Sequence, residues 1–551
     1  MRKKVLFILT LILAISILLP CAKAAADETL KIYKSTVEFR HFYFETDENN
    51  MIVNYDKNKT VKTTFNTIVI ENPFIKVTLL PEYGGRILSI IYKPTGHEML
   101  YQNPVGAPYG IKEGNFYYDW LMVYGGIFPT FPEPEHGKAW CLPWESEIIE
   151  QSDEKISVEM KFTDTISSGP NVPGKFDNGR TDLTLISTVT VYRDKSYVDY
   201  NIRLVNNKNE PVNYEYWTCV TFAPGSEPNN TYCPPDTEIV APISKVLLKD
   251  DWWPWMGSSE KAISKSNHVF EYNNLAHFKN WKDMGIAYAY PEVSENWWGV
   301  INHENEVGLL RIADNKNSTP GLKFWTWGID SKNVNPETFE NPARPYIELW
   351  AGHSPQFFAD TKIGPNEEKA WTEHYIPTIG MSKVTHANEN AAIYLNHAPD
   401  EKKENILFNA EIFATHPNEV LKVSLCLEGK NSYILLEETI EVNPTAPAKY
   451  SVPLPLDKPE NGEYTYQLIL SNDTGKILAQ AQIPFKTEDY REASKDSGET
   501  NAGPELPAAS SSVNDNAGIW YFAVGAIIIL LIFSIILVIC IIKYRKGHVA
   551  K

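Results

Sequence analysis

The segment LTLISTVTVYRDKSYVDYNIRLVNN, residues 183–207, decides the fold prediction for this chain. Apolar and polar residues alternate in both halves, and the polar run RDKS between the halves is typical of a turn. This is the pattern of two antiparallel strands that each bury one face. The same alternation recurs at residues 67–81, 85–94, 147–164, 285–291 and 307–314, whereas helical periodicity is nearly absent. We therefore predict an all-β domain over residues 66–384, large enough to form a sandwich or barrel with its own core.

The composition changes after this domain, and the change predicts a second one. Apart from Trp520, every tryptophan lies between Trp120 and Trp371. Residues 385–486 consist of short alternating runs at regular spacing, which favours a small immunoglobulin-like β-sandwich. Residues 27–65 are expected to add edge strands to the large domain. Residues 487–516, rich in Ser, Ala, Glu, Pro and Asn, predict a flexible stalk.

Both ends of the chain predict export and membrane attachment. Residues 1–24 combine a basic start, an apolar stretch and small residues, which is typical of a signal peptide; Cys21 leaves a lipoprotein as the alternative. Residues 517–543 contain an uncharged apolar stretch long enough to span a bilayer, and the short tail 544–551 that follows it is basic. We therefore expect a single-pass cell-membrane protein whose large N-terminal part is extracellular.

Charge and cysteine content narrow the classes of partner. The formal net charge is −18 at pH 7, and it falls by eight to −26 once the eight Lys and Arg residues of the leader, anchor and tail are set aside. Such a surface argues against nucleic acid and suits neutral ligands. Four cysteines remain outside the leader and anchor, without the spacing of a zinc site. We predict no metal and no cofactor, and a disulfide between Cys219 and Cys233 stays an open alternative.

Two predicted strands place polar groups among aromatic rings. In YIELW, residues 346–350, alternation puts Tyr346, Glu348 and Trp350 on one face and the aliphatic residues on the other. The strand LKFWTWG, residues 322–328, likewise groups Lys323 with Trp325 and Trp327. Sugar C–H faces stack on aromatic rings while sugar hydroxyls bond to carboxylates, so the pattern suits a carbohydrate site. The alternative is a tryptophan-rich core whose glutamate is satisfied by an arginine.

A third feature is the loop YGGIFPTFPEPEHGKAW, residues 124–140. Its prolines exclude a helix and a central strand, and long ordered loops in compact domains are usually functional. His136 is the candidate side chain in it.

These motifs resemble, in order, those of the galactose mutarotase-like superfamily, which includes the aldose 1-epimerases. The matching segments are TLLPEYGGRILSIIYKPTGHEMLYQNP at 78–104, the loop from 124 to Trp144, YVDYNIRLVNN with EPVNYEYW at 197–217, and YIELWAGHSPQFFADTKIGPNEEKAW at 346–371. The chain is similar to an exported branch of that group. The resemblance implies a mutarotase-like supersandwich over residues 66–384.

The resemblance also implies roles for particular residues. Glu348 matches the catalytic base, His136 a sugar-contacting histidine, and Arg86 a polar residue near the site. The catalytic histidine of the epimerases, the second half of their acid–base pair, would fall at Tyr216–Cys219, where this sequence has none. His277 or His353 could substitute from a neighbouring loop.

We therefore expect a membrane-anchored, extracellular carbohydrate-binding protein that lacks classical epimerase turnover. The expected site has Glu348 as candidate base, with substrate contacts from His136, Arg86, Trp325, Trp327, Trp350, Tyr346, His277 and His353. One alternative is a glycan-active enzyme: an epimerase, a lyase, or a hydrolase that sets Glu133 or Glu135 opposite Glu348. Another is a structural envelope protein. We expect Glu348 and His136 to line the same pocket. Their positions in the structure would distinguish a ligand site from a tryptophan-rich core.

Overall fold

The computed structural model describes residues 29–46, 52–106, 125–132, 137–140, 142–165, 180–248, 262–264, 269–273, 275–282, 285–326, 328–329, 346–357, 359, 361–417 and 419–495. The predicted leader, the predicted span 517–543, the tail, His136 and Trp327 lie outside these ranges. Within them, no helix combines the length and the apolar character that a membrane crossing requires.

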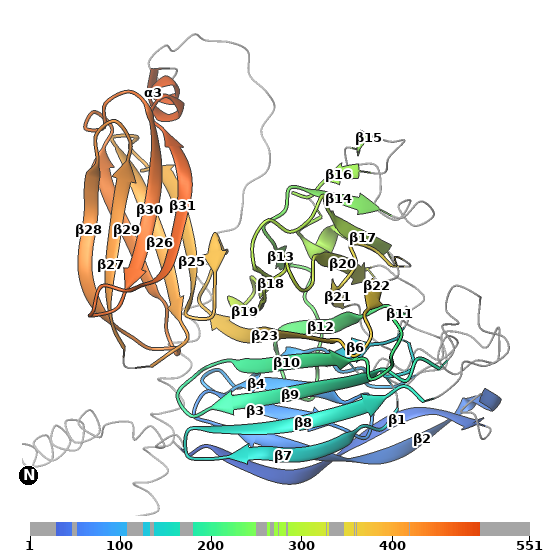
Figure 1. Ribbon diagram of the computed structural model, residues 1–551. Helices are drawn as coiled ribbons and strands as arrows, with labels where there is room; N and C mark the ends of the chain where they lie inside the picture. Colours follow the sequence, from blue (N-terminus) through green and yellow to red (C-terminus); the bar gives the residue numbers. More distant parts are fainter. Residues whose placement is uncertain are drawn as a thin grey trace, which may run out of the picture. The chain divides into compact units, whose positions relative to one another are not determined.

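The prediction of an all-β chain is confirmed: strands account for most of the described residues (Figure 1). The first large sheet is thirteen-stranded among the described residues. It comprises β1 (Lys31–Thr46), β2 (Ile52–Glu71), β3 (Ile75–Leu80), β4 (Arg86–Tyr92), β5 (His97–Leu100), β6 (Ile127–Thr130), β12 (Trp217–Ser226), β14 (Lys245–Leu248), β15 (Ala262–Ser264), β16 (Val269–Glu271), β17 (Gly285–Tyr290), β20 (Gly321–Thr326) and β21 (Ile347–Gly352).

The second large sheet is eight-stranded over the same described ranges. It comprises β7 (Glu145–Gln151), β8 (Lys155–Thr163), β9 (Thr184–Tyr192), β10 (Val198–Val205), β13 (Thr237–Val240), β18 (Trp297–Asn302), β19 (Val307–Ile312) and β23 (Glu368–Ile379). The segment 183–207 supplies β9 and β10, which pair antiparallel with Leu185 opposite Leu204. Among the described residues, this region also contains a short pair, β11 (Val212–Tyr214) with β22 (Thr361–Ile363), and the 3-10 turn η2 (Phe278–Asn280).

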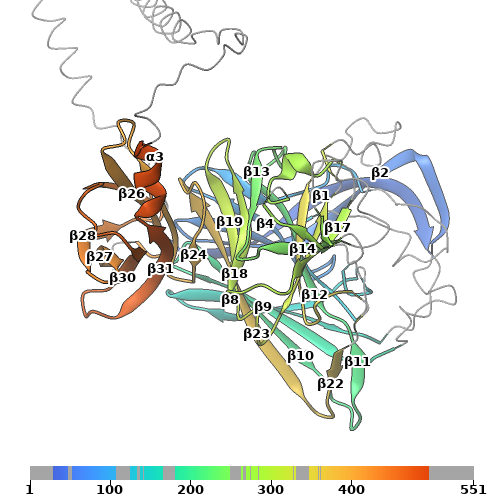
Figure 2. The same ribbon diagram turned by 90° about the horizontal axis from the view of Figure 1, so that it is seen from above.

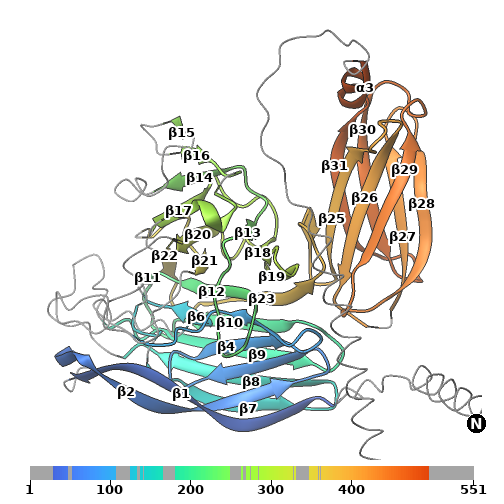
Figure 3. The same cartoon turned by 180° about the vertical axis from the view of Figure 1, so that it is seen from behind.

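The two large sheets pack face to face, as the front and rear views show for β7–β10 against β1–β4 (Figures 1 and 3). Their inward side chains form one continuous cluster, here called the main core, to which both sheets contribute. Because successive side chains of a strand point to opposite faces of the sheet, every second residue of a strand belongs to the main core. On β21, Ile347, Leu349 and Ala351 face the main core, while Glu348 and Trp350 face away from it.

A buried ion pair lies inside the main core. Arg311 Nε is 2.7 Å from Glu373 Oε2, and both side chains have no solvent exposure. The remaining guanidinium nitrogens donate to Asn315 and Thr319, and the carboxylate accepts further hydrogen bonds from Thr218, Trp371 and Tyr375. Because every member has partners, the network offsets the cost of burying two charges. We assign it a structural role.

The C-terminal strands form two four-stranded sheets with a core of their own. One holds β24 (His386–Ala387), β25 (Ala391–Pro399), β26 (Asn405–Ala414) and β29 (Ala448–Pro455); the other holds β27 (Glu419–Glu428), β28 (Tyr433–Val442), β30 (Glu463–Ser471) and β31 (Ile477–Lys486). The short helix α3 (Glu488–Lys495) follows β31 (Figure 2). Arg491 in α3 donates to the carbonyl oxygens of Leu456 and Pro459, which holds the helix against the sandwich.

Candidate functional site

A second apolar cluster lies on the face of the thirteen-stranded sheet that points away from the main core. We call it the aromatic cluster; it consists of Phe39, Phe42, Leu80, Tyr83, Leu88, Phe128, Trp140, Trp217, Cys219, Ile286, Tyr288, Trp350 and Phe357. Every member is at most 8% exposed. The N-terminal hairpin β1–β2 contributes Phe39 and Phe42, so this hairpin forms one wall of the cluster. This face of the sheet also buries charged side chains, Arg86, Lys323 and Glu348, as the main core does with Arg311 and Glu373.

Glu348 is the central charged residue of the aromatic cluster. Its side chain is 2% exposed. Tyr346 Oη donates to Glu348 Oε1 at 2.8 Å, and Trp350 Nε1 donates to Glu348 Oε2 at 2.8 Å. Burial and the nearby carboxylate raise the pKa of Tyr346 well above its usual range, so its hydroxyl keeps the proton that it donates. The Cys219 thiol is also within hydrogen-bonding reach of the Glu348 carboxylate.

Lys323 and Cys219 flank Glu348 on the neighbouring strands. The Lys323 ammonium lies 3.8 Å from the ring centre of Trp350 and 3.9 Å from that of Phe357, within cation–π range. Cys219 pairs with Trp350 across β12 and β21. Burial, and next the charge of Glu348, raise the pKa of the Cys219 thiol well above its usual range. Cys219, Cys233 and Cys426 are all free thiols, so no bridge joins Cys219 to Cys233.

Arg86 lies fully buried beside the aromatic cluster and holds backbone in place. Its guanidinium donates to the carbonyl oxygens of Tyr83 at 2.7 Å, Gly125 at 2.9 Å and Trp140 at 2.5 Å. Gly84 explains part of the motif PEYGGR: its φ is +80°, and a Cβ there would lie 1.9 Å from the Trp140 carbonyl oxygen. The Arg86 side chain therefore ties three loop carbonyls together at the edge of the cluster.

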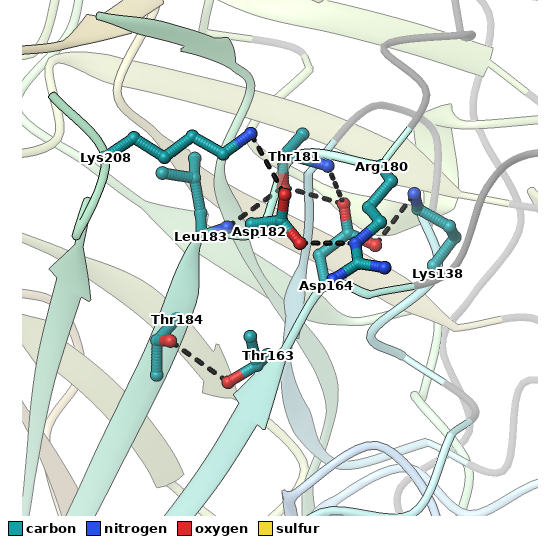
Figure 4. Close-up of polar contacts among 9 residues, drawn as sticks. All are labelled: Lys138, Thr163, Asp164, Arg180, Thr181, Asp182, Leu183, Thr184 and Lys208. Carbon is teal, nitrogen blue, oxygen red and sulfur yellow. Dashed lines mark hydrogen bonds and ion pairs between the residues drawn. The ribbon is translucent and has the colours of Figure 1, made fainter. Parts of the chain in front are cut away.

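The loop that carries His136 is anchored on both sides of the residues that are not described. Gly137 bridges to Phe131, and the amides of Lys138 and Ala139 donate to the Phe131 carbonyl oxygen. Lys138 Nζ lies 2.8 Å from Asp164 Oδ1, and both side chains are fully buried. Thr181 donates to the other oxygen of Asp164 through its amide and its hydroxyl (Figure 4). This buried ion pair fixes where the loop returns to Trp140.

His353 and His277 lie away from Glu348. The His353 ring packs against Tyr214, Tyr216 and Trp371, which belong to the main core. Burial, assisted by the charge of Lys369, lowers the pKa of His353 to about 3. His277 forms an isolated backbone bridge with Glu238 on β13 of the eight-stranded sheet.

The structure thus brings together Glu348, Trp350, Tyr346 and Arg86 from the sequence-predicted set, with Trp325 packed partly buried between the main core and the aromatic cluster. His136 and Trp327 lie outside the described residues. Sequence reasoning considered Cys219 only as a possible disulfide partner and missed the hairpin residues Phe39 and Phe42. Cys219 could have been found, because it lies in the stretch Tyr216–Cys219, where the resemblance predicted a histidine. The hairpin offered no such signal, because only the fold brings β1 next to β4 and β12.

Comparison with known proteins gives one family and several distant structures. The model of the family described as "Domain of unknown function (DUF5107)" matches residues 49–378, more than half of the chain. A TPR-domain containing protein from Parabacteroides distasonis has a TM-score of 0.49 at 18% identity; the match covers 64% of this chain and 55% of that one. The chain therefore spans about half the length of that protein.

Two galactose mutarotase-like proteins are also similar to the chain. One, from Clostridium acetobutylicum, has a TM-score of 0.40 at 12% identity, covering 64% of this chain and all of that one. The other, from Lactobacillus casei, has a TM-score of 0.36 at 11% identity, covering 56% and 99% of the two chains. The chain belongs to the family described as Domain of unknown function (DUF5107).

Proposed function

We propose that this chain is a carbohydrate-binding protein whose site is built around Glu348. The observation that carries the proposal is a carboxylate held by Tyr346 and Trp350 at 2.8 Å each, buried among aromatic rings. Aromatic rings accept the apolar faces of a sugar, and a fixed carboxylate accepts hydrogen bonds from adjacent hydroxyls.

We further propose that the site binds without classical aldose 1-epimerase turnover. Mutarotation needs a group that protonates the ring oxygen and a group that removes the proton from the anomeric hydroxyl, both with a pKa near the working pH. The stretch Tyr216–Cys219, where the histidine was expected, contains no histidine, and the raised pKa of its Cys219 keeps that thiol protonated at neutral pH. His353, a suggested substitute, packs in the main core and its low pKa keeps it neutral, so it is a poor proton donor at pH 7.

The proposed location is the outer surface of the cell membrane. The supports are sequence features: the leader-like residues 1–24, the apolar stretch at 517–543 with basic residues after it, and the stalk-like composition of 487–516. Protease treatment of intact cells provides a test, because an outward orientation predicts release of a large soluble fragment. Retention of the whole chain in the cells, with no fragment released, would contradict it.

The proposed function can be tested with the full-length chain purified in detergent. We expect retention of the chain on a subset of an immobilised glycan panel, and no new products when the same glycans are incubated with it in solution. Polarimetry should show no acceleration of glucose or galactose mutarotation. A matched control is Glu437→Gln, which removes an exposed carboxylate on β28 of the small sandwich. Acceleration of mutarotation that Glu348→Gln abolishes and Glu437→Gln does not would overturn the binding-only proposal.

A further inference from the structure

A groove of about 940 Å³ lies on the face of the eight-stranded sheet that points away from the main core. Its floor is strand β23. Trp371, Glu373 and Tyr375 face the core, so the alternate residues Thr372 and His374 face outward and line the groove. The volume is at the upper end of the range of about 300–1,000 Å³ that is usual for small-molecule sites. The groove therefore has room for a ligand as large as several linked sugar units.

Two imidazoles held by carboxylates face this groove. His374 Nδ1 lies 2.6 Å from Asp199 Oδ1, and His386 Nδ1 lies 2.9 Å from Glu295 Oε2. In the neutral ring, donation from Nδ1 to the carboxylate makes Nε2 the hydrogen-bond acceptor. Such pairs also serve as metal ligands, but no three ligating side chains converge at metal-binding geometry anywhere in the described residues. An organic ligand with hydroxyl donors is the better match.

The charged residues that line the groove determine which ligand charge it can accept. Asp314, Lys316 and Ser318 come from the loop after β19, and Glu389 comes from the turn after β24. Three carboxylates, including Glu295, face a single lysine along the lining, so phosphates and uronic acids would be repelled. Thr372, Ser318 and amide side chains supply further hydrogen-bonding groups. The lining therefore suits a neutral, hydroxyl-rich ligand.

We propose that this groove is a second carbohydrate site, which binds a neutral oligosaccharide segment. The inference rests on the proposed function for the choice of ligand class, but it uses a different site. Glu348 faces away from the main core on the thirteen-stranded sheet, and the groove faces away from it on the eight-stranded sheet. Two sites separated by the core can hold two segments of one long glycan, or two glycans, and so raise avidity without any new contact.

The test uses the full-length chain in detergent with three neutral tetrasaccharides, cellotetraose, maltotetraose and xylotetraose, and with trigalacturonate as the anionic comparison. Thr372→Arg fills the groove floor, and Ser318→Trp fills it from the loop without changing the sheet. The matched control is Thr188→Arg, because Thr188 and Thr372 both pair with Asn201 on the same outer face and Thr188 does not line the groove. Calorimetry gives the number of sites, and hydrogen exchange of residues 313–318 reports the groove directly.

The proposal expects a neutral tetrasaccharide to bind at two sites, with slowed exchange at residues 313–318 and no binding of trigalacturonate. Thr372→Arg and Ser318→Trp should each remove one site and the exchange protection, whereas Thr188→Arg and Glu348→Gln should leave that protection unchanged. If Glu348→Gln removes all binding and the groove variants remove none, the groove proposal is wrong and the proposed function stands. If only the groove variants remove binding, the groove proposal stands and the proposed site at Glu348 is wrong. No heat from any tetrasaccharide at millimolar concentration would overturn both.

Discussion

Trp350 donates its indole N–H to the carboxylate of Glu348, two residues earlier on the same strand, with 2.8 Å between Nε1 and Oε2. Side chains two residues apart on a strand share a face, so the pair is set by the backbone and not by a flexible loop. A similar bond joins Trp217, the first residue of β12, to Glu215 in the connection from β11, at 2.9 Å. At Glu348 it fixes one carboxylate oxygen, and Tyr346 fixes the other. The acid is held in one orientation before any ligand arrives.

Trp350→Phe should therefore weaken sugar binding at Glu348 by at least tenfold. It should also lower the free energy of unfolding by about 1–3 kcal/mol, because a hydrogen bond to a charged buried group is lost. Trp281→Phe is the control: Trp281 Nε1 donates to the Leu275 carbonyl oxygen in the main core, so its loss should lower stability and leave affinity unchanged. Fluorescence titration and chemical denaturation measure the two quantities. Equal affinity for Trp350→Phe and wild type would contradict the role of the indole.

The Arg311–Glu373 network should be the most sensitive polar element of the core. Burial alone would raise the pKa of Glu373. The charge of Arg311 and its hydrogen bond lower the pKa by more than burial raises it, so the pKa of Glu373 lies below its usual range. Glu373→Gln leaves an unpaired buried guanidinium and should cost about 3–5 kcal/mol in urea denaturation. The double variant Arg311→Met with Glu373→Leu should cost less than Glu373→Gln alone. A loss below about 1 kcal/mol for Glu373→Gln would show that the pair is not isolated from water.

His353 should make stability depend on pH. Its folded pKa is about 3, well below the unfolded value of about 6.5, so between these values the unfolded chain binds a proton that the folded chain does not. Stability is therefore lost as pH falls below about 6.5, by up to about 1.4 kcal/mol per pH unit from this residue. His353→Asn should reduce the slope of unfolding free energy between pH 6 and pH 4 by about that amount. Identical slopes for the two proteins would show that His353 does not titrate in this way.

The buried thiols should resist alkylation in the folded protein. Cys219 has no exposed surface and a raised pKa, and the pKa of Cys233 is raised to about 12 by burial. Because the thiolate is the reactive form, iodoacetamide at pH 8 should modify both only after unfolding. Peptide mass spectrometry with and without urea measures this. A peptide that links Cys219 to Cys233 would contradict the free thiols of the structure.

Much of the fold could be predicted because the alternation of apolar and polar residues indicates β-strands. The segment 183–207 became β9 and β10, and Ile347, Leu349 and Glu348 lie on the faces that alternation assigned to them. Alternation depends only on local geometry, so one sequence is enough to see it. Residues 488–495 of the predicted stalk form the helix α3 and not a flexible segment. The rest of the stalk and the membrane span stay predictions, because residues 496–551 lie outside the described ranges.

The candidate site was harder to predict because its parts come from distant strands. Sequence alone could not show that β12 would set Cys219 beside Glu348, or that His353 would turn into the main core while Trp350, three residues earlier, faces the other way. Arg86 was expected to touch ligand, and the structure shows its guanidinium on three backbone carbonyls. Chain topology, and not the nature of each residue, decides these neighbours.

The most direct test of the account is calorimetric titration of wild type and Glu348→Gln with whichever glycan a panel identifies. The substitution keeps the shape of the side chain and removes its charge, while the proximity of Tyr346 and Trp350 is retained. We predict that wild type binds with measurable heat and quenches tryptophan fluorescence, and that Glu348→Gln loses at least tenfold in affinity while it stays folded, with a free energy of unfolding lower by about 1–3 kcal/mol. Unchanged affinity in a folded Glu348→Gln protein would contradict a carbohydrate site at this glutamate.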